Sequence, residues 1–300
     1  MTDYSELFRA VAIPRLVGTP KHQQVREILK RELAARGFAV EEHAFTGRPA
    51  RALLGTAREV HGVNLIARQP LSLRTVPGGP TLQGGKVWLV AHYDSKGQPI
   101  SMAVRLMGFF ALVTGLVGLL LSPVPAALLL LIGLLIISQN RVTDNSPGAV
   151  DNASALVAVF MALDQLPDKH AVGVIFPDAE EFGLVGARAL AAERGALFAD
   201  ACVINLDGLD DAGRAIALLH KPGRIGTAVA AALGARRARW LPVIVDGIAL
   251  AAVAAECCTI LKGNWRTMRI VHRPEDTAAR VRLDGAAAVA AGLARVLRAP

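Results

Sequence analysis

The stretch VGVIFPDAEEFGLVGARAL, residues 172–190, decides the fold class. It opens with the apolar run VGVIF, which predicts a mostly buried strand. The acidic pair Glu180 and Glu181 follows, and an apolar pattern at helical spacing begins near Leu184. A buried strand, a short polar loop and a helix together make the repeating unit of an α/β sheet whose faces are covered.

Other segments repeat this alternation along the chain. Residues 23–36 carry apolar side chains at helical spacing and stop at Gly37, which predicts an amphipathic helix. The segments with strand patterns are FAVEEHAF (38–45), GVNLIA (62–67), VWLVA (87–91), ACVINL (201–206) and the shorter MRIV (268–271). Because helical stretches lie between several of these strands, we expect an α/β fold with a mixed, mostly parallel sheet covered by helices on both faces.

Composition bounds the class of protein. The chain has 300 residues, of which 53% are hydrophobic and 19% charged, which excludes a disordered chain and a small disulfide-stapled module. The net charge of +8 favours contact with anionic surfaces without selecting one, and we expect no nucleic-acid partner. Three cysteines without a C-x-x-C pair indicate neither a disulfide framework nor a thiolate zinc site, and a reducing compartment fits best.

One apolar segment interrupts the alternation. Residues 106–140 contain no charged side chain, and Ser122-Pro123-Val124-Pro125 divides them. We expect a transmembrane helical hairpin over 102–140, inserted into a discontinuous domain of residues 1–101 and 141–300. A 16-residue helix spans about 24 Å against a hydrocarbon core of about 30 Å, so the prediction needs a start at Met102, with Arg105 reaching the interface. A hairpin dipping into one leaflet, a core helix pair and a dimer surface are the alternatives.

Flanking charges orient this predicted hairpin. Two crossings return the chain to one side, so the parts before and after the hairpin share a compartment. Lys96, Arg105 and Arg141 flank it, and the positive-inside rule then places that compartment in the cytoplasm. We therefore expect a protein of the cytoplasmic membrane, with a lipid bilayer as partner and the large domain facing the cytoplasm. The amino terminus carries no apolar run of signal-peptide length.

Acids and histidines follow the predicted strands, where open α/β sheets place their sites. Each has an ordinary alternative: a loop residue, a helix cap or a solvated face. Together they form a set of nitrogen and oxygen ligands without sulfur, which suits Zn²⁺ or a similar divalent ion in a catalytic site. Metal-assisted hydrolysis also needs an uncoordinated carboxylate to take a proton. The candidate residues are His92, Asp94, Asp151, Glu180, Glu181, Asp207 and His272.

The ordered motifs resemble those of the co-catalytic di-zinc aminopeptidases, the family of aminopeptidase Y and bacterial leucyl aminopeptidases. Residues 15–38 are also similar to the family's amino-terminal helix, so the resemblance covers most of the chain except the apolar insertion. The motifs that carry it are AHYDSK (91–96), PGAVDNASA (147–155), DAEEFGLVGARAL (178–190), NLDG (205–208) and HRPEDT (272–277). A zinc exopeptidase fold with two Zn²⁺ ions per chain is what the resemblance implies.

The resemblance also implies roles for individual residues. His92 and Asp207 are expected on one zinc ion, Glu181 and His272 on the other, and Asp151 between the two. Glu180 is expected to act as the general base on a water molecule that bridges the metals. Asp94 is expected to hydrogen-bond the imidazole of His92. The implied substrate is a peptide with a free amino terminus, from which the enzyme removes the first residue.

Two departures from the family pattern limit what it implies. The gap from His92 to Asp151 is much longer than in soluble relatives and contains the insertion. The Ser-Asp-His pattern of the family is reduced to Asp246 followed by Gly247, so its histidine is absent and the substrate pocket is not inferred. A glutaminyl-peptide cyclase using a single zinc on the same scaffold and a catalytically silent membrane scaffold are the alternative functions.

Overall fold

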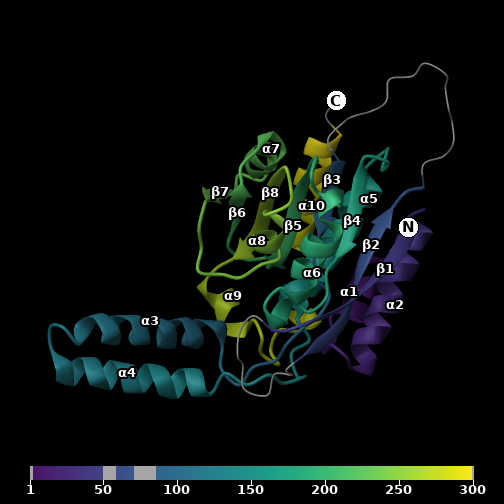
Figure 1. Ribbon diagram of the computed structural model, residues 1–300. Helices are drawn as coiled ribbons and strands as arrows, with labels where there is room; N and C mark the ends of the chain where they lie inside the picture. The colour runs from purple at the N-terminus through teal and green to yellow at the C-terminus, as the bar shows by residue number, and fades with distance from the viewer. Residues whose placement is uncertain (1–2, 50–58, 71–85, 299–300) are drawn as a thin grey trace, which may run out of the picture.

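The computed structural model describes residues 3–49, 59–70 and 86–298, and its centre is one eight-stranded sheet (Figure 1). The middle of the sheet is parallel, because β3 pairs in parallel with β4 and β5, and β5 with β8. Antiparallel pairs lie nearer the edges, between β1 and β2, β2 and β4, and β6 and β8. In order across the sheet the strands are β1 (Ala39–Gly47), β2 (Val60–Arg68), β4 (Val172–Phe176), β3 (Lys86–Val90), β5 (Ala201–Leu209), β8 (Glu256–Gly263), β6 (Arg214–Lys221) and β7 (Arg236–Ala238).

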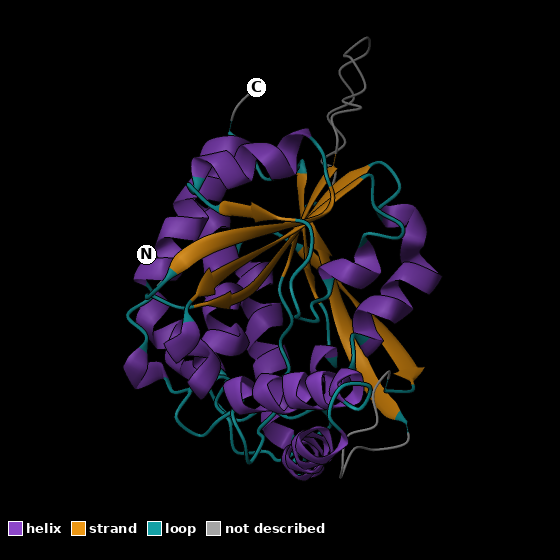
Figure 2. Ribbon diagram, turned by 90° about the vertical axis from the view of Figure 1, so that its left-hand side faces the viewer, coloured by secondary structure: helices purple, strands orange, loops and turns teal. Residues whose placement is uncertain are grey.

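Helices cover both faces of the twisted sheet (Figure 2). Every residue of β4 is buried, as expected for a central strand whose sequence is a continuous apolar run. Helices α6 (Val185–Arg194) and α8 (Gly247–Leu250) pack with one set of buried strand side chains. The larger apolar cluster, which contains the other strand side chains, also includes residues from α1 (Tyr4–Val11), α2 (Pro20–Ala35), α5 (Ser154–Gln165), α7 (Arg224–Ala232) and α10 (Asp284–Leu297).

The strand expected over MRIV (268–271) is wrong. Those residues lie in and just after the short helix α9 (Trp265–Ile270), which begins at a capping box between Asn264 and Thr267. The strand of this region is β8, whose sequence ECCTILKG was not recognised as a strand pattern. Strands β6 and β7 were also not predicted. The short helical turns are η1 (Ala149–Ala153), η2 (Glu180–Phe182), η3 (Gly195–Leu197) and η4 (Ala278–Arg280).

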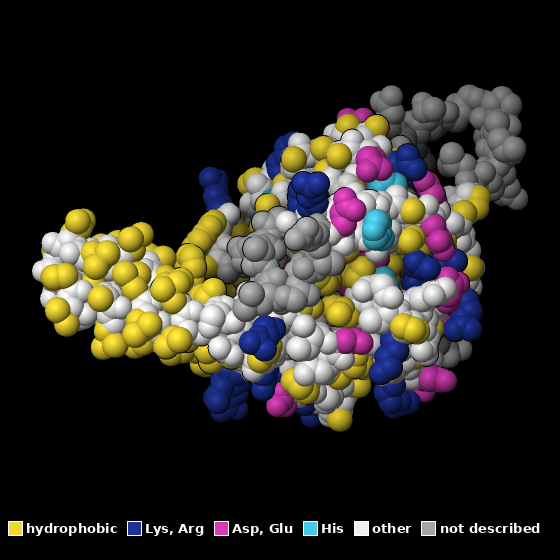
Figure 3. All heavy atoms as spheres, turned by 60° about the horizontal axis from the view of Figure 1, so that its bottom comes forward, with side chains coloured by type: hydrophobic (Ala, Val, Ile, Leu, Met, Phe, Trp, Pro, Cys, Tyr) yellow, Lys and Arg dark blue, Asp and Glu magenta, His cyan; other side chains and the backbone are white. Residues whose placement is uncertain are grey.

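The apolar insertion forms two antiparallel helices, α3 (Met102–Gly118) and α4 (Pro123–Ser138), which project from the rest of the molecule (Figure 1). The helices meet through small residues, since a Cβ on Gly133 would lie 2.9 Å from the carbonyl oxygen of Gly108. Apolar side chains surround the pair (Figure 3), and Leu120 at its tip is 89% exposed. The division of the chain into an α/β domain and an insertion stays a prediction.

The predicted transmembrane hairpin is wrong. Across the described residues, no helix combines the length and the apolar character that crossing a bilayer requires. Helix α3 has 17 residues and α4 has 16, which correspond to about 24–26 Å at 1.5 Å per residue, short of a hydrocarbon core of about 30 Å. The same finding overturns the predicted location in the cytoplasmic membrane with the large domain facing the cytoplasm.

Candidate metal centre

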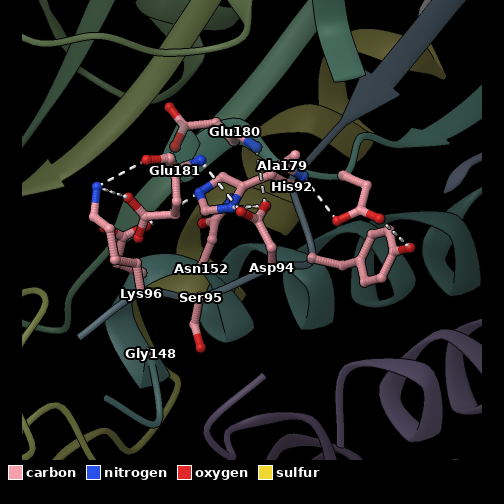
Figure 4. Close-up of polar contacts among 12 residues, drawn as sticks. His92, Asp94, Ser95, Lys96, Gly148, Asn152, Ala179, Glu180 and Glu181 are labelled. Carbon is pink, nitrogen blue, oxygen red and sulfur yellow. Dashed lines mark hydrogen bonds and ion pairs between the residues drawn. The ribbon is translucent and has the colours of Figure 1, made fainter. Parts of the chain in front are cut away.

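The end of β3 and the loop after β4 are joined by one buried carboxylate. His92 and Asp94 follow β3, and the Asp94 carboxylate lies 3.3 Å from Nδ1 of His92. Its two oxygens also accept hydrogen bonds from the backbone N–H groups of Glu180, at 3.1 Å, and Glu181, at 3.2 Å (Figure 4). Asp94 therefore fixes both the histidine and the acidic pair relative to each other.

Asp151 lies between the two histidines. Its Oδ1 is 3.1 Å from Nε2 of His92, and its Oδ2 is 3.1 Å from Nε2 of His272. The same nitrogen of His272 is 3.0 Å from Oε1 of Glu181. One carboxylate thus faces two separate groups of ligand atoms with its two oxygens.

The five residues expected to bind metal come together at this point. His92, Asp151 and Asp207 form one cluster whose ligand atoms all lie within 4.8 Å of one another. Asp151, Glu181 and His272 form a second cluster by the same measure, so Asp151 belongs to both. The segments that supply these side chains are far apart in the sequence and meet where central strands of the sheet end.

A buried arginine and an aspartate hold the loop that carries Asp151. Arg15 is fully buried and donates to the carbonyl oxygens of Tyr93, at 2.7 Å, and Gly148, at 3.1 Å. Asp276 accepts from the backbone N–H of Val150 at 2.8 Å and from that of Asp151 at 3.3 Å. These contacts fix the loop from both sides.

Asn152 connects the same loop to Asp207. Its side chain donates to the carbonyl of Leu206 at 3.0 Å and accepts from the N–H of Gly208 at 3.2 Å. Asp207 therefore lies between two residues whose backbones are tied to the Asp151 loop. The sequence assigns no role to Asn152, whose side chain contacts the neighbouring strand β5.

The two glutamates have opposite electrostatic environments. Burial alone raises the pKa of Glu181, but His272 and Lys96 lower it to about 2. Lys96 lies 3.1 Å from Oε2 of Glu181 and donates to its backbone carbonyl at 2.9 Å (Figure 4). Burial raises the pKa of Glu180 well above its ordinary value, and the neighbouring carboxylates of Glu181 and Asp207 raise it further. Glu181 is thus held as an anion, whereas Glu180 binds a proton more readily.

The residues fit a cation. Burial and the adjacent Asp151 raise the pKa of Asp207 to about 7, because buried carboxylates repel one another without a positive charge between them. Among the described side chains, Oε1 of Glu181 and both carboxylate oxygens of Asp246 are buried without a hydrogen-bond partner. Two imidazoles and three carboxylates without a thiolate are ligands for Zn²⁺ or a similar ion at a catalytic site.

Several residues around the clusters were not assigned a role from the sequence. Lys96 ends the AHYDSK motif and flanks the insertion, and Asp246 belongs to an incomplete motif, but neither has an expected role. Arg105 was expected to reach a membrane interface, and this expectation is wrong. Its Nη1 lies 3.1 Å from Nδ1 of His272. Side chains this long extend in directions that sequence spacing does not determine.

A comparison with protein families decides the assignment. The model of peptidase family M28 matches residues 74–297, which is most of the chain and includes both ligand clusters. The chain belongs to peptidase family M28. Membership in M28 supports a hydrolase that acts on peptides, with residue clusters able to hold metal. No curated protein matches the chain.

Solved structures share the fold of this M28 protein. Glutaminyl cyclase from Porphyromonas gingivalis has a TM-score of 0.64 at 18% identity, covering 98% of this chain and 96% of its own. An aminopeptidase from Aneurinibacillus sp. strain AM-1 has a TM-score of 0.63 at 12% identity, covering 98% and 92%. Glutaminyl cyclase from Bacteroides thetaiotaomicron has a TM-score of 0.65 at 16% identity, covering 99% and 96%. At these identities the likeness shows the fold alone.

Proposed function

We propose that this M28 protein is a zinc-dependent aminopeptidase that removes amino-terminal residues from peptides. The observation that carries the proposal is Asp151, whose two oxygens face two separate ligand clusters. Sites with two metal ions and a shared carboxylate suit hydrolysis, because the pair can stabilise both the attacking and the leaving group. His92 and Asp207 would hold one zinc ion, Glu181 and His272 the other, and Asp151 both.

Zinc, when bound, supplies a Lewis acid that polarises the scissile carbonyl and lowers the pKa of water. Glu180 then acts as the general base and takes a proton from the attacking water. Its raised pKa suits this role, since a base must hold the proton long enough to deliver it to the leaving amine. Asp94 keeps Glu180 in place through the hydrogen bond that it accepts from the Glu180 backbone.

The charge of the site supports a substrate with a free amino terminus. Besides burial, Asp207 and Asp246 raise the pKa of Glu180, and Asp207 raises that of Asp246, so three acidic side chains gather at this end of the site. A protonated α-amino group is attracted to such a surface, whereas a carboxyl-terminal carboxylate is repelled. We therefore place the first residue of the peptide, and the bond that follows it, at the metal centre.

The product distinguishes this function from glutaminyl cyclisation. The purified protein is stripped of metal, reloaded with zinc, and incubated with peptides that begin with leucine, alanine, arginine or glutamine. Mass spectrometry that detects a free amino acid and a peptide shortened by one residue supports the aminopeptidase. Formation of pyroglutamyl peptide and ammonia from the glutamine peptide, without cleavage of the others, overturns it in favour of a cyclase. Zinc binding without turnover of any peptide overturns both activities.

A further inference from the structure

The two histidines of the metal centre have opposite partners behind them. Nδ1 of His92 faces the Asp94 carboxylate at 3.3 Å. Nδ1 of His272 instead lies 3.1 Å from the Arg105 guanidinium, which α3 supplies from its first turn. A histidine that binds metal through one nitrogen ordinarily donates the proton on the other to a carboxylate, a carbonyl or water. The Asp94 carboxylate beside His92 is able to accept such a proton, whereas Arg105 beside His272 is a donor and a cation.

The attachment of the hairpin keeps Arg105 in this position. The backbone N–H of Gln98 donates to the carbonyl of His272 at 2.7 Å, and its side chain donates to Asn140, which follows α4, at 2.5 Å. Arg105 donates to the side-chain oxygen of the same glutamine. Both ends of the hairpin are therefore tied to Gln98, which in turn bonds the backbone of His272, a residue of the second cluster.

The contact restricts where the ring proton of His272 lies. A guanidinium can only donate, so its hydrogen bond requires a lone pair on Nδ1 and leaves the ring proton on Nε2. Nε2 itself lies 3.1 Å from Oδ2 of Asp151 and 3.0 Å from Oε1 of Glu181. Binding of a metal at Nε2 requires the lone pair there instead, and the proton then moves to Nδ1, opposite the Arg105 donor. The hydrogen bond is lost, and a fixed positive charge stays beside the incoming cation.

We propose that Arg105 is a positioning residue that weakens zinc binding at the Glu181 and His272 position. The inference rests on the proposed function, because it takes these residues as zinc ligands. The position held by His92 and Asp207 then fills first, and the second position fills only at higher zinc concentration. Since Arg105 belongs to α3, the packing of the hairpin against the domain sets the occupancy of the second position.

A zinc titration of the metal-free protein tests the proposal. Competition with a chromophoric chelator should resolve two affinities in the wild type, with the second weaker. Arg105→Gln and Arg105→Met should each strengthen the second affinity about tenfold and leave the first unchanged, the size seen when partners of ligating histidines are altered. In His272→Ala the weak site should be absent, and adding Arg105→Gln should then change nothing, which locates the effect at His272.

Arg141→Gln is the matched control. It removes a positive charge at the other end of the hairpin, from an exposed side chain that makes no hydrogen bond or ion pair within the described residues. It should change neither affinity by more than about twofold, because an exposed charge is screened by solvent and salt. An unchanged or weaker second affinity in both Arg105 variants overturns the inference while leaving the aminopeptidase intact. A wild type that binds no zinc overturns the proposed function and the inference with it.

Discussion

Glu180 is the residue on which the proposed chemistry depends. Glu180→Gln keeps the size of the side chain and removes its ability to take a proton. We expect the turnover number on amino-terminal peptides to fall by about 10²- to 10⁴-fold, the usual contribution of a general base. Zinc content, measured by elemental analysis, should stay at the wild-type value, because Glu180 is not among the clustered ligand residues. Near-normal turnover in this variant would be incompatible with its role as the base.

At the scale of single residues, short side chains were easier to predict than long ones. His92, Asp151 and Asp207 follow or end a predicted element, and their short side chains stay near the backbone that the sheet positions. Arg15 and Arg105 lie outside the five motifs that contain the ligands, and the directions of their side chains depend on packing that has no local signal. The two arginines hold the loop of Asp151 and contact His272, respectively.

Packing within the hairpin depends on a close approach at Gly133. An added Cβ there would lie 2.7 Å from Cγ of Leu112 and 2.9 Å from the Gly108 carbonyl oxygen, so α3 and α4 must separate. We expect Gly133→Ala to destabilise the helix pair by about 1–3 kcal/mol, as other overpacked sites are. The measurement is the rate of proteolysis within the hairpin, followed by mass spectrometry. Proteolysis should be faster in Gly133→Ala than in the wild type.

Gly118→Ala provides the control for this effect. Its Cβ would lie 3.4 Å from that of Ala126, which is an ordinary contact. Alanine has the higher helix propensity, so this substitution should leave the proteolysis rate unchanged or lower it. Equal rates for the two variants would mean that the close approach at Gly133 does not hold the helices together.

His220 on β6 should make stability depend on pH. Burial lowers its pKa from 6.5 to about 4, and its ring contacts Thr259 Oγ1 at 2.8 Å. Between these two values the unfolded chain takes up a proton that the folded chain excludes, so the free energy of unfolding decreases as pH falls from 6.5 to 4. His220→Gln removes this titration and should show a smaller decrease. Urea unfolding of the metal-free wild type and variant at pH 7 and pH 5 checks this prediction. Equal decreases in the free energy of unfolding would exclude His220 as a source of the pH dependence.

Errors at the scale of elements come from competing local signals. The apolar run MRIV resembles a short strand, but the side chain of Asn264 caps the preceding residues and begins a helix. The true neighbouring strand, β8, contains two cysteines and a lysine, and its pairing with β5 and β6 overrides that weak pattern. The insertion was recognised as two apolar helices from its lack of charge. The turn between them lies at residues 119–122 and not at residues 122–125, where the sequence divides the insertion, so α3 ends at Gly118 and α4 begins at Pro123.

At the scale of the whole molecule, the metal centre and the hairpin are in contact. Motifs separated by up to 180 positions meet because central strands end at one edge of the sheet, which the order of strands and motifs made predictable. The sequence placed the insertion beside the site only in terms of chain position. The contacts of Gln98 and Arg105 make it part of the structure that surrounds His272.

Zinc should stabilise the entire fold. The stabilisation should differ between a variant of the shared ligand, Asp151, and a variant of an unshared ligand, His272. The clustered carboxylates repel one another in the metal-free chain, and an ion that binds only the folded state stabilises it by about 2.7 kcal/mol at a concentration 100 times its Kd. Asp151→Ala removes a ligand from both clusters and should lose both zinc ions and nearly all of the zinc-dependent rise in Tm. His272→Ala should keep one ion and part of the rise, because the cluster of His92, Asp151 and Asp207 is intact. Calorimetry with and without zinc, together with zinc counts, separates these outcomes, and a full rise in Asp151→Ala would show that Asp151 is not the shared ligand.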